Sequence, residues 1–130
     1  MKLKLGNYDI EIIHHDPTIF TVEQVLTDSE CEHFQKIASK NMKRSMVSGF
    51  DKEQNKRGLL DNRRTSSNCW ISHSLDQITQ DVGNRISELV QVPITHAESY
   101  QVLHYTDSQE YQPHLDTFDP LVKEYSHYLK

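Results

Sequence analysis

The chain has 130 residues, of which 35% are hydrophobic, and carries a formal net charge of −5 at pH 7. This length predicts that residues 1–130 form a single domain. The acidic balance disfavours a protein that mainly binds phosphate backbones, so we expect no nucleic-acid partner. No apolar run reaches the length of a signal segment or a membrane span, which favours a cytoplasmic protein without a membrane partner. Cys31 and Cys69 lack metal-type spacing, and we expect a reduced pair, although a disulfide stays open.

The first third of the chain predicts strands followed by a helix. Partial apolar alternation from Leu3 to Ile13 favours one strand or two short ones, and residues 18–22 continue in the same style. Thr27 followed by Glu30 is typical of a capping box at a helix start. Apolar side chains then recur at helical spacing, at Cys31, Phe34, Ile37, Ala38 and Met42. The cationic side chains Lys40, Lys43 and Arg44 are expected at the C-terminal end of this helix.

The middle and the end of the chain predict a loop, a helix and then strands. Residues 48–63 contain almost no apolar side chain, which indicates a long loop that serves as a lid, as a binding loop or as a disordered segment. A second helix is expected from a Ser74 cap, with Gln77 three residues later, and should end before Pro93. Its expected apolar face consists of Leu75, Ile78, Val82, Ile86, Leu89 and Val90. Beyond it we expect a long strand over 94–105, a turn at 107–109, a strand over 111–118, and a loop or short helix over 119–130.

The most informative motif is His114-Leu-Asp116. Residues two apart on a strand point to the same side, so one metal ion could bind both the imidazole and the carboxylate. Such a pair is two thirds of the 2-His-1-carboxylate triad of non-haem iron oxygenases. A bare His-x-Asp is weak by itself, because the chain contains a second copy at His14 and Asp16. That copy runs into Pro17, which favours a turn, and we interpret it as a solvated strand end.

Three blocks in the same order resemble the prolyl 4-hydroxylase-like branch of the Fe(II)/2-oxoglutarate dioxygenases. The first runs from Pro17 to Phe34 and resembles the entry strand and first helix of that branch. The second, Arg64 to Trp70, resembles its Arg-x-Ser-x-x-x-Trp element. The third is in register at Glu98, Gln101, Val102, Tyr105, Gln109, Tyr111, His114, Asp116 and Phe118. One departure is Ser108, which stands where this family usually has Gly, although Ser also occurs in such turns.

The resemblance implies an α+β fold in which N-terminal helices pack on a β-sheet that begins a double-stranded β-helix, or jelly roll. It implies the hydroxylation of a proline-containing peptide or protein by O2, with Fe(II), 2-oxoglutarate and ascorbate as cofactors. His114 and Asp116 would be catalytic iron ligands, and Tyr105 would bind 2-oxoglutarate. The family's peptide-binding positions fall on Arg64, Ser66, Trp70, Glu98 and Tyr111. Arg63 competes with Arg64, but the spacing to Ser66 and Trp70 favours Arg64.

The resemblance also implies parts of the site that this sequence does not contain. The family's distal His and the Lys or Arg that pairs with 2-oxoglutarate would lie beyond Lys130, and His127 is too close to His114 to serve as the distal ligand. We therefore expect an N-terminal portion with an incomplete barrel that is inactive alone. Such a piece would associate with itself or with a complementing C-terminal half. The alternatives are a non-catalytic peptide-binding or split-subunit fragment and, disfavoured by the acidic charge, an oxygenase that acts on nucleic acid.

Overall fold

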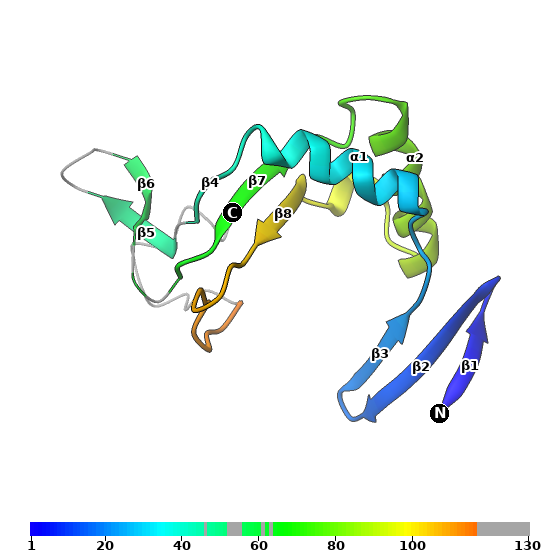
Figure 1. Ribbon diagram of the computed structural model, residues 1–130. Coiled ribbons are helices and arrows are strands. Elements are labelled where there is room, and N and C mark those ends of the chain that lie inside the picture. The colour runs from blue at the N-terminus through cyan, green and yellow to red at the C-terminus, as the bar shows by residue number, and fades with distance from the viewer. Residues whose placement is uncertain (46, 52–55, 61, 63, 117–130) are drawn as a thin grey trace. The chain divides into compact units, whose positions relative to one another are not determined.

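The computed structural model describes residues 1–45, 47–51, 56–60, 62 and 64–116. The described chain folds into helices and antiparallel strands, which confirms the α+β class (Figure 1). It divides into two compact units, each made from two stretches of sequence. Unit 1 comprises residues 1–40 and 70–102, and unit 2 comprises residues 41–69 and 103–130. No helix in the described part of the chain is both long enough and apolar enough to cross a membrane.

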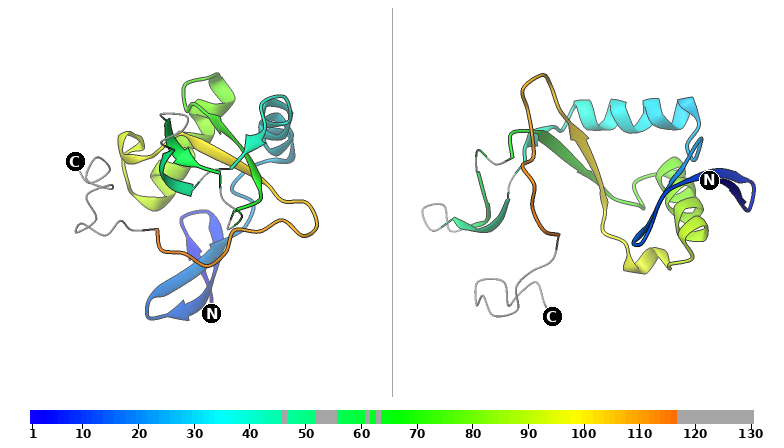
Figure 2. Two further views of the ribbon diagram at one scale, coloured as in Figure 1. Left: turned by 90° about the vertical axis from the view of Figure 1, so that its left-hand side faces the viewer. Right: turned by 90° about the horizontal axis from the view of Figure 1, so that it is seen from below.

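Unit 1 begins with an antiparallel meander of three strands, β1 (Lys2–Leu5), β2 (Tyr8–His15) and β3 (Thr18–Val22) (Figure 1, Figure 2). This confirms the alternative of two short strands in the first thirteen residues. The turn between β1 and β2 contains Gly6, whose φ of +60° is a conformation that glycine adopts without strain. The register pairs Leu3 with Ile10 and Ile12 with Phe20, so apolar side chains gather on one face of the meander.

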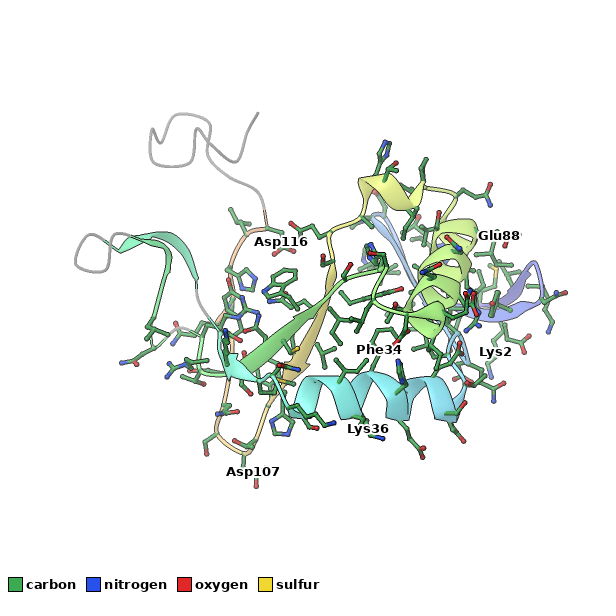
Figure 3. All side chains as sticks on the ribbon, turned by 90° about the horizontal axis from the view of Figure 1, so that it is seen from above. Lys2, Phe34, Lys36, Glu88, Asp107 and Asp116 are labelled. Carbon is green, nitrogen blue, oxygen red and sulfur yellow. The ribbon has the colours of Figure 1, made fainter. Side chains whose placement is uncertain are left out.

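The first helix, α1 (Asp28–Ser39), starts where the sequence predicts. The Thr27 hydroxyl accepts a hydrogen bond from the Glu30 N–H, and the Glu30 carboxylate accepts one from the Thr27 N–H, which completes the capping box. The helix ends earlier than expected, because Lys43–Arg44 forms strand β4 instead of its last turn. Phe34 and Ala38 are buried, and Phe34 points inward while Lys36 points away on the opposite side (Figure 3).

The second helix, α2 (Gln77–Val90), starts later than the sequence predicts. Asp76 caps it, because its carboxylate accepts a hydrogen bond from the Thr79 N–H at 2.9 Å and the Thr79 hydroxyl accepts one from the Asp76 N–H. The predicted Ser74 cap is therefore wrong, and Leu75 lies outside the helix, 54% exposed. The predicted long strand over 94–105 is also divided, into the 3-10 turn η1 (Ile94–His96) and strand β8 (Tyr100–His104).

The core of unit 1 lies where α1, α2, β7 (Ser67–Ile71) and β8 meet. Phe34 packs edge-on against Tyr100 with ring centroids 4.9 Å apart, and Ile71 on β7 and Val82 on α2 are almost fully buried. The helices thus pack on strands, as the resemblance implies. The sheet order is β4-β7-β8, and none of the described sheets closes into a barrel.

Unit 2 contains the segment for which the sequence predicts a long loop. Val47–Asp51 forms β5 and Lys56–Leu59 forms β6, which pair as an antiparallel hairpin. The loop prediction is therefore wrong for these residues. The interpretations of this stretch as a lid and of 119–130 as a loop or short helix, together with Arg63, Phe118 and His127, involve residues 52–55, 61, 63 and 117–130, which lie outside the described residues.

Candidate active site

Six of the eight predicted site residues lie in unit 2: Arg64, Ser66, Tyr105, Tyr111, His114 and Asp116. The segment that carries the last three is held by contacts with Arg64 and Thr65. Arg64 and Tyr111 form an isolated antiparallel bridge, and the Thr65 N–H donates to the Glu110 carbonyl at 2.7 Å. The Glu110 N–H donates in turn to the Thr65 hydroxyl at 2.8 Å. This reciprocal pair fixes the register of two segments that are 45 residues apart in sequence.

The segment from Gln112 to Asp116 is irregular beyond the bridge at Tyr111, so the predicted strand over 111–118 is wrong for these residues. His114 and Asp116 nevertheless approach each other, with Nε2 and Oδ1 3.3 Å apart. An irregular backbone segment, rather than strand alternation, brings the two groups together. Cis ligands of an octahedral ion bound at about 2.1 Å lie about 3 Å apart, which is close to this separation.

The His114 ring is oriented by a backbone contact that the sequence does not reveal. Its Nδ1 lies 2.8 Å from the carbonyl oxygen of Gln112, so Nδ1–H donates and, in the neutral imidazole that a metal ion binds, Nε2 carries the lone pair. Metal-bound histidines commonly use their second nitrogen in this way. Nε2 then faces the Asp116 carboxylate, which is 95% exposed. Two acceptor atoms that converge in this way suit a bound cation.

The second His-x-Asp copy has a different geometry. His14 directs Nδ1 at the carbonyl oxygen of Pro17, 2.8 Å away, and no ion pair joins His14 to Asp16 in the structure. His14, near the end of β2, and Asp16, in the turn that follows, are both exposed, as the interpretation of a solvated strand end requires. The two copies therefore differ in whether the His and Asp side chains approach each other, which binding to one metal ion requires.

An aromatic stack connects Arg64 to the proposed metal ligand. The Arg64 guanidinium carbon lies 4.5 Å from the centroid of the Tyr111 ring. The other pair in the stack, Tyr111 and His114, has ring centroids 3.6 Å apart and an interplanar angle of 10°. The stack places a cation, a phenol and an imidazole in consecutive layers.

Ser66 is fully buried, and its hydroxyl donates to Ser45 Oγ at 3.1 Å. Its role in peptide binding stays a prediction, because the hydroxyl is engaged within unit 2. Tyr105 directly follows β8 and is 42% exposed, so its phenol is accessible to a ligand.

The remaining two predicted residues lie in unit 1. Trp70 is on β7 and is 54% exposed, whereas its neighbours Cys69 and Ile71 are buried. Glu98 lies between η1 and β8 and lines a largely apolar pocket of about 400 Å³ with His73 and Tyr100. The exposure of both side chains is compatible with ligand contact, and their roles stay predictions.

Sequence reasoning missed the residues that hold the site together. The Gln112 carbonyl is a backbone group and leaves no signal in the sequence. Thr65, Glu110 and Ser45 have ordinary polar side chains without motif spacing, and only their contacts reveal their roles. Among the described residues, no three His, Cys, Asp or Glu side chains gather closely enough to hold a metal ion.

Comparison with known proteins finds relatives of the chain among the prolyl 4-hydroxylases. No family model matches it. It is 38% identical over 116 residues to a protein named "Probable prolyl 4-hydroxylase 8", 34% over 114 residues to prolyl 4-hydroxylase 5 and 34% over 118 residues to prolyl 4-hydroxylase 1, all from Arabidopsis thaliana. These matches cover 87%, 87% and 89% of this chain but only 39%, 38% and 41% of the relatives.

The chain is homologous to prolyl 4-hydroxylases over most of its length, which confirms the resemblance seen in its motifs. It spans about two fifths of the length of these curated relatives.

Proposed function

We propose that this chain supplies part of the active site of an Fe(II)- and 2-oxoglutarate-dependent dioxygenase of the prolyl 4-hydroxylase type. His114 and Asp116 would be two of the iron ligands. The observation that carries the proposal is the 3.3 Å approach of His114 Nε2 to Asp116 Oδ1, with Nδ1 already committed to the Gln112 carbonyl. An imidazole nitrogen and a carboxylate are donors that Fe(II) accepts, so the residues fit the ion.

The chemistry supplied at such a site is the oxidative decarboxylation of 2-oxoglutarate by O2 to succinate and CO2, coupled to hydroxylation of a peptidyl proline. Ascorbate would keep the iron reduced. The residues of this chain would bind and orient the reactants. Tyr105 would donate its phenol O–H to the distal carboxylate of 2-oxoglutarate. Arg64 and Trp70 would bind the peptide, because a guanidinium can donate to a peptide carbonyl and an indole offers a flat face to a proline ring.

Anaerobic titration with Fe(II) tests the metal ligands. We expect weak binding to the wild-type chain, and we expect His114→Ala and Asp116→Ala each to abolish it. His14→Ala and Asp16→Ala are matched controls, because they remove the same residue types from the other His-x-Asp copy and should leave binding unchanged. Binding that depends on the control pair, or on neither pair, would contradict the proposal.

Tyr105→Phe tests the co-substrate role. A lost hydrogen bond to a charged group costs about 1.5–3 kcal/mol, so the affinity for 2-oxoglutarate in the presence of Fe(II) should fall roughly tenfold to a hundredfold. Fe(II) binding without 2-oxoglutarate should not change, and this serves as the control. Unchanged 2-oxoglutarate affinity would count against the role.

A non-catalytic function is the second candidate, and the exposed face of Trp70 favours it. An indole that is 54% exposed on an ordered strand is a ready contact for a proline-containing segment. In that case the chain would bind the peptide without turning it over, alone or with a complementing chain. Peptide binding that is lost when Trp70 is replaced but unchanged in His114→Ala would distinguish this function from the first.

A further inference from the structure

The stack of Arg64, Tyr111 and His114 restricts the orientation of the imidazole ring of the proposed metal ligand. His114 keeps 39% of its side chain exposed, so burial alone does not fix its ring. The hydrogen bond from Nδ1 to Gln112 holds one edge of the imidazole but leaves the ring able to tilt about that bond. The Tyr111 ring, almost parallel at 10° and 3.6 Å between centroids, restricts this tilt.

Tyr111 itself is held from both sides. The Arg64 guanidinium covers the ring, and the Thr65–Glu110 hydrogen bonds fix the backbone on the N-terminal side of Tyr111. Arg64 is tied in turn by its carbonyl oxygen, which accepts from Arg44 Nε and from one terminal nitrogen at 3.2 Å each. The chain thus builds a rigid support behind a ring that carries a proposed ligand.

We propose that Tyr111 is a positioning residue for His114, with Arg64 as the outer layer of the support. This inference rests on the proposed metal site and adds a role for the Tyr111 ring beyond contact with a peptide. The flat face of the ring performs the role, and its hydroxyl does not. Groups that orient a metal-bound histidine are typically worth about tenfold to a hundredfold in metal affinity, and we expect a loss of about tenfold without the ring face.

The test uses the 130-residue chain and Mn²⁺ as a paramagnetic probe of divalent-cation binding. NMR follows the broadening of the imidazole C–H signals of His114, with His14 and His15 as internal controls. Tyr111→Phe keeps the ring face and should behave as wild type. Tyr111→Leu removes it and should need about tenfold more Mn²⁺ to broaden His114, with the controls unchanged. The upfield shift that the stacked ring imposes on His114 should persist in the Phe variant and disappear in the Leu variant.

Three results would overturn the inference. The first is unchanged broadening of His114 in Tyr111→Leu. The second is an equal loss in Tyr111→Phe, which would assign the role to the hydroxyl. The third is the absence of preferential broadening at His114 in the wild type, which would overturn the proposed metal site as well.

The Glu110 amide signal reports whether Tyr111→Leu preserves the backbone support. If that signal moves, Arg64→Gln provides the measurement instead, because it leaves both rings in place and removes only the outer cation. The attraction between a cation and an aromatic face is modest at a partly exposed site. Its removal should lower the Mn²⁺ affinity at His114 about threefold. An affinity equal to that of the wild type would then overturn the role of Arg64 in the support.

Discussion

At the scale of single residues, Ser108 shows how one backbone angle bears on the site. It lies in the turn that connects β8 to the bridge at Tyr111, beside Asp107, whose side chain points outward (Figure 3). Its φ of +68° is in the left-handed region, and the Gln109 N–H donates to the Thr106 carbonyl at 3.0 Å to close the turn. Glycine adopts this angle without strain, whereas a residue with a Cβ adopts it at a cost in free energy.

Ser108→Gly should therefore stabilise unit 2. Relief of the left-handed strain is worth about 1–2 kcal/mol, and the added freedom of glycine in the unfolded chain costs about 0.5–1 kcal/mol. The net gain in the free energy of unfolding should be about 0.5–1 kcal/mol, measured by urea denaturation. Ser108→Ala keeps the Cβ and should give no gain. A glycine variant that is less stable than the wild type would show that the turn carries no strain.

At the scale of elements, Gly83 determines how closely α2 approaches β8. A Cβ at this position would lie 2.8 Å from the Tyr100 hydroxyl oxygen and 3.2 Å from Ile94 Cδ1. The same hydroxyl donates to the Thr79 carbonyl on α2 at 2.6 Å. From the helical pattern alone, Gly83 only lowers the intrinsic stability of the helix slightly. In the folded chain it is the point at which α2 contacts β8.

Gly83→Ala should therefore destabilise the chain, although alanine is intrinsically better in a helix by about 1 kcal/mol. Overpacking typically costs about 1–3 kcal/mol, so we expect a net loss of about 1 kcal/mol in thermal or urea unfolding. The loss should be smaller in a Tyr100→Phe background, because the closest atom is then absent. A Gly83→Ala variant that is more stable than the wild type would contradict the close approach.

The two helices are joined by an ion pair that links stability to pH. Arg85 on α2 donates to both carboxylate oxygens of Glu30 on α1, at 2.7 and 2.9 Å, and to the Val25 carbonyl. The Arg85 hydrogen bond, helped by the Thr27 N–H, lowers the pKa of Glu30 from 4.5 to about 2. His33 and Asp76 make a second contact between the same helices, at 2.6 Å.

Because the folded-state pKa of Glu30 is lowered, its contribution is complete above about pH 4.5 and is lost as the pH falls towards about 2. Allowing for solvent screening, the contribution should be about 1–2 kcal/mol. Urea denaturation at pH 7, 4 and 2.5 should show wild type and Glu30→Gln converging as the pH falls. A stability difference that is independent of pH would show that the carboxylate charge is not the cause.

At the scale of the whole molecule, each unit is assembled from two separate stretches of sequence, and the predicted site residues are divided between the units. Unit 2 contains the proposed metal ligands with Arg64, Ser66, Tyr105 and Tyr111, whereas Trp70 and Glu98 lie in unit 1. The single-domain prediction stays a prediction. Within the described residues, only two groups of metal-ligand type converge at the proposed centre.

We expect that the 130-residue chain does not sustain turnover by itself, because the two proposed protein ligands would hold iron weakly. Incubation with Fe(II), ascorbate, 2-oxoglutarate and a proline-rich peptide should release no more succinate than a metal-only control. The His114→Ala variant provides the matched background. Sustained, peptide-dependent succinate release by the wild type would refute this expectation and would show that a third ligand is supplied from elsewhere, for example by a second copy of the chain.

The sequence by itself determined the features that depend on local chemistry. The capping box at Thr27, the strands before it, the turn near Ser108 and the family resemblance all follow from short patterns whose physical effect is local. The start of α2 was harder to predict from the sequence, because Asp76 and Ser74 are both good caps. The contact with His33 favours Asp76 in the folded chain. Strand pairing overrode the polar composition of Val47–Asp51 and Lys56–Leu59, which pair as antiparallel strands.

Only the tertiary structure decided how the proposed site is held. The approach of His114 to Asp116 occurs in an irregular segment, where period-two alternation does not apply. The support depends on a backbone carbonyl at Gln112, on Thr65 paired with Glu110, and on the ring of Tyr111 between Arg64 and His114. Contacts between segments 45 residues apart leave no periodic pattern in the sequence, because they form only when the chain has folded.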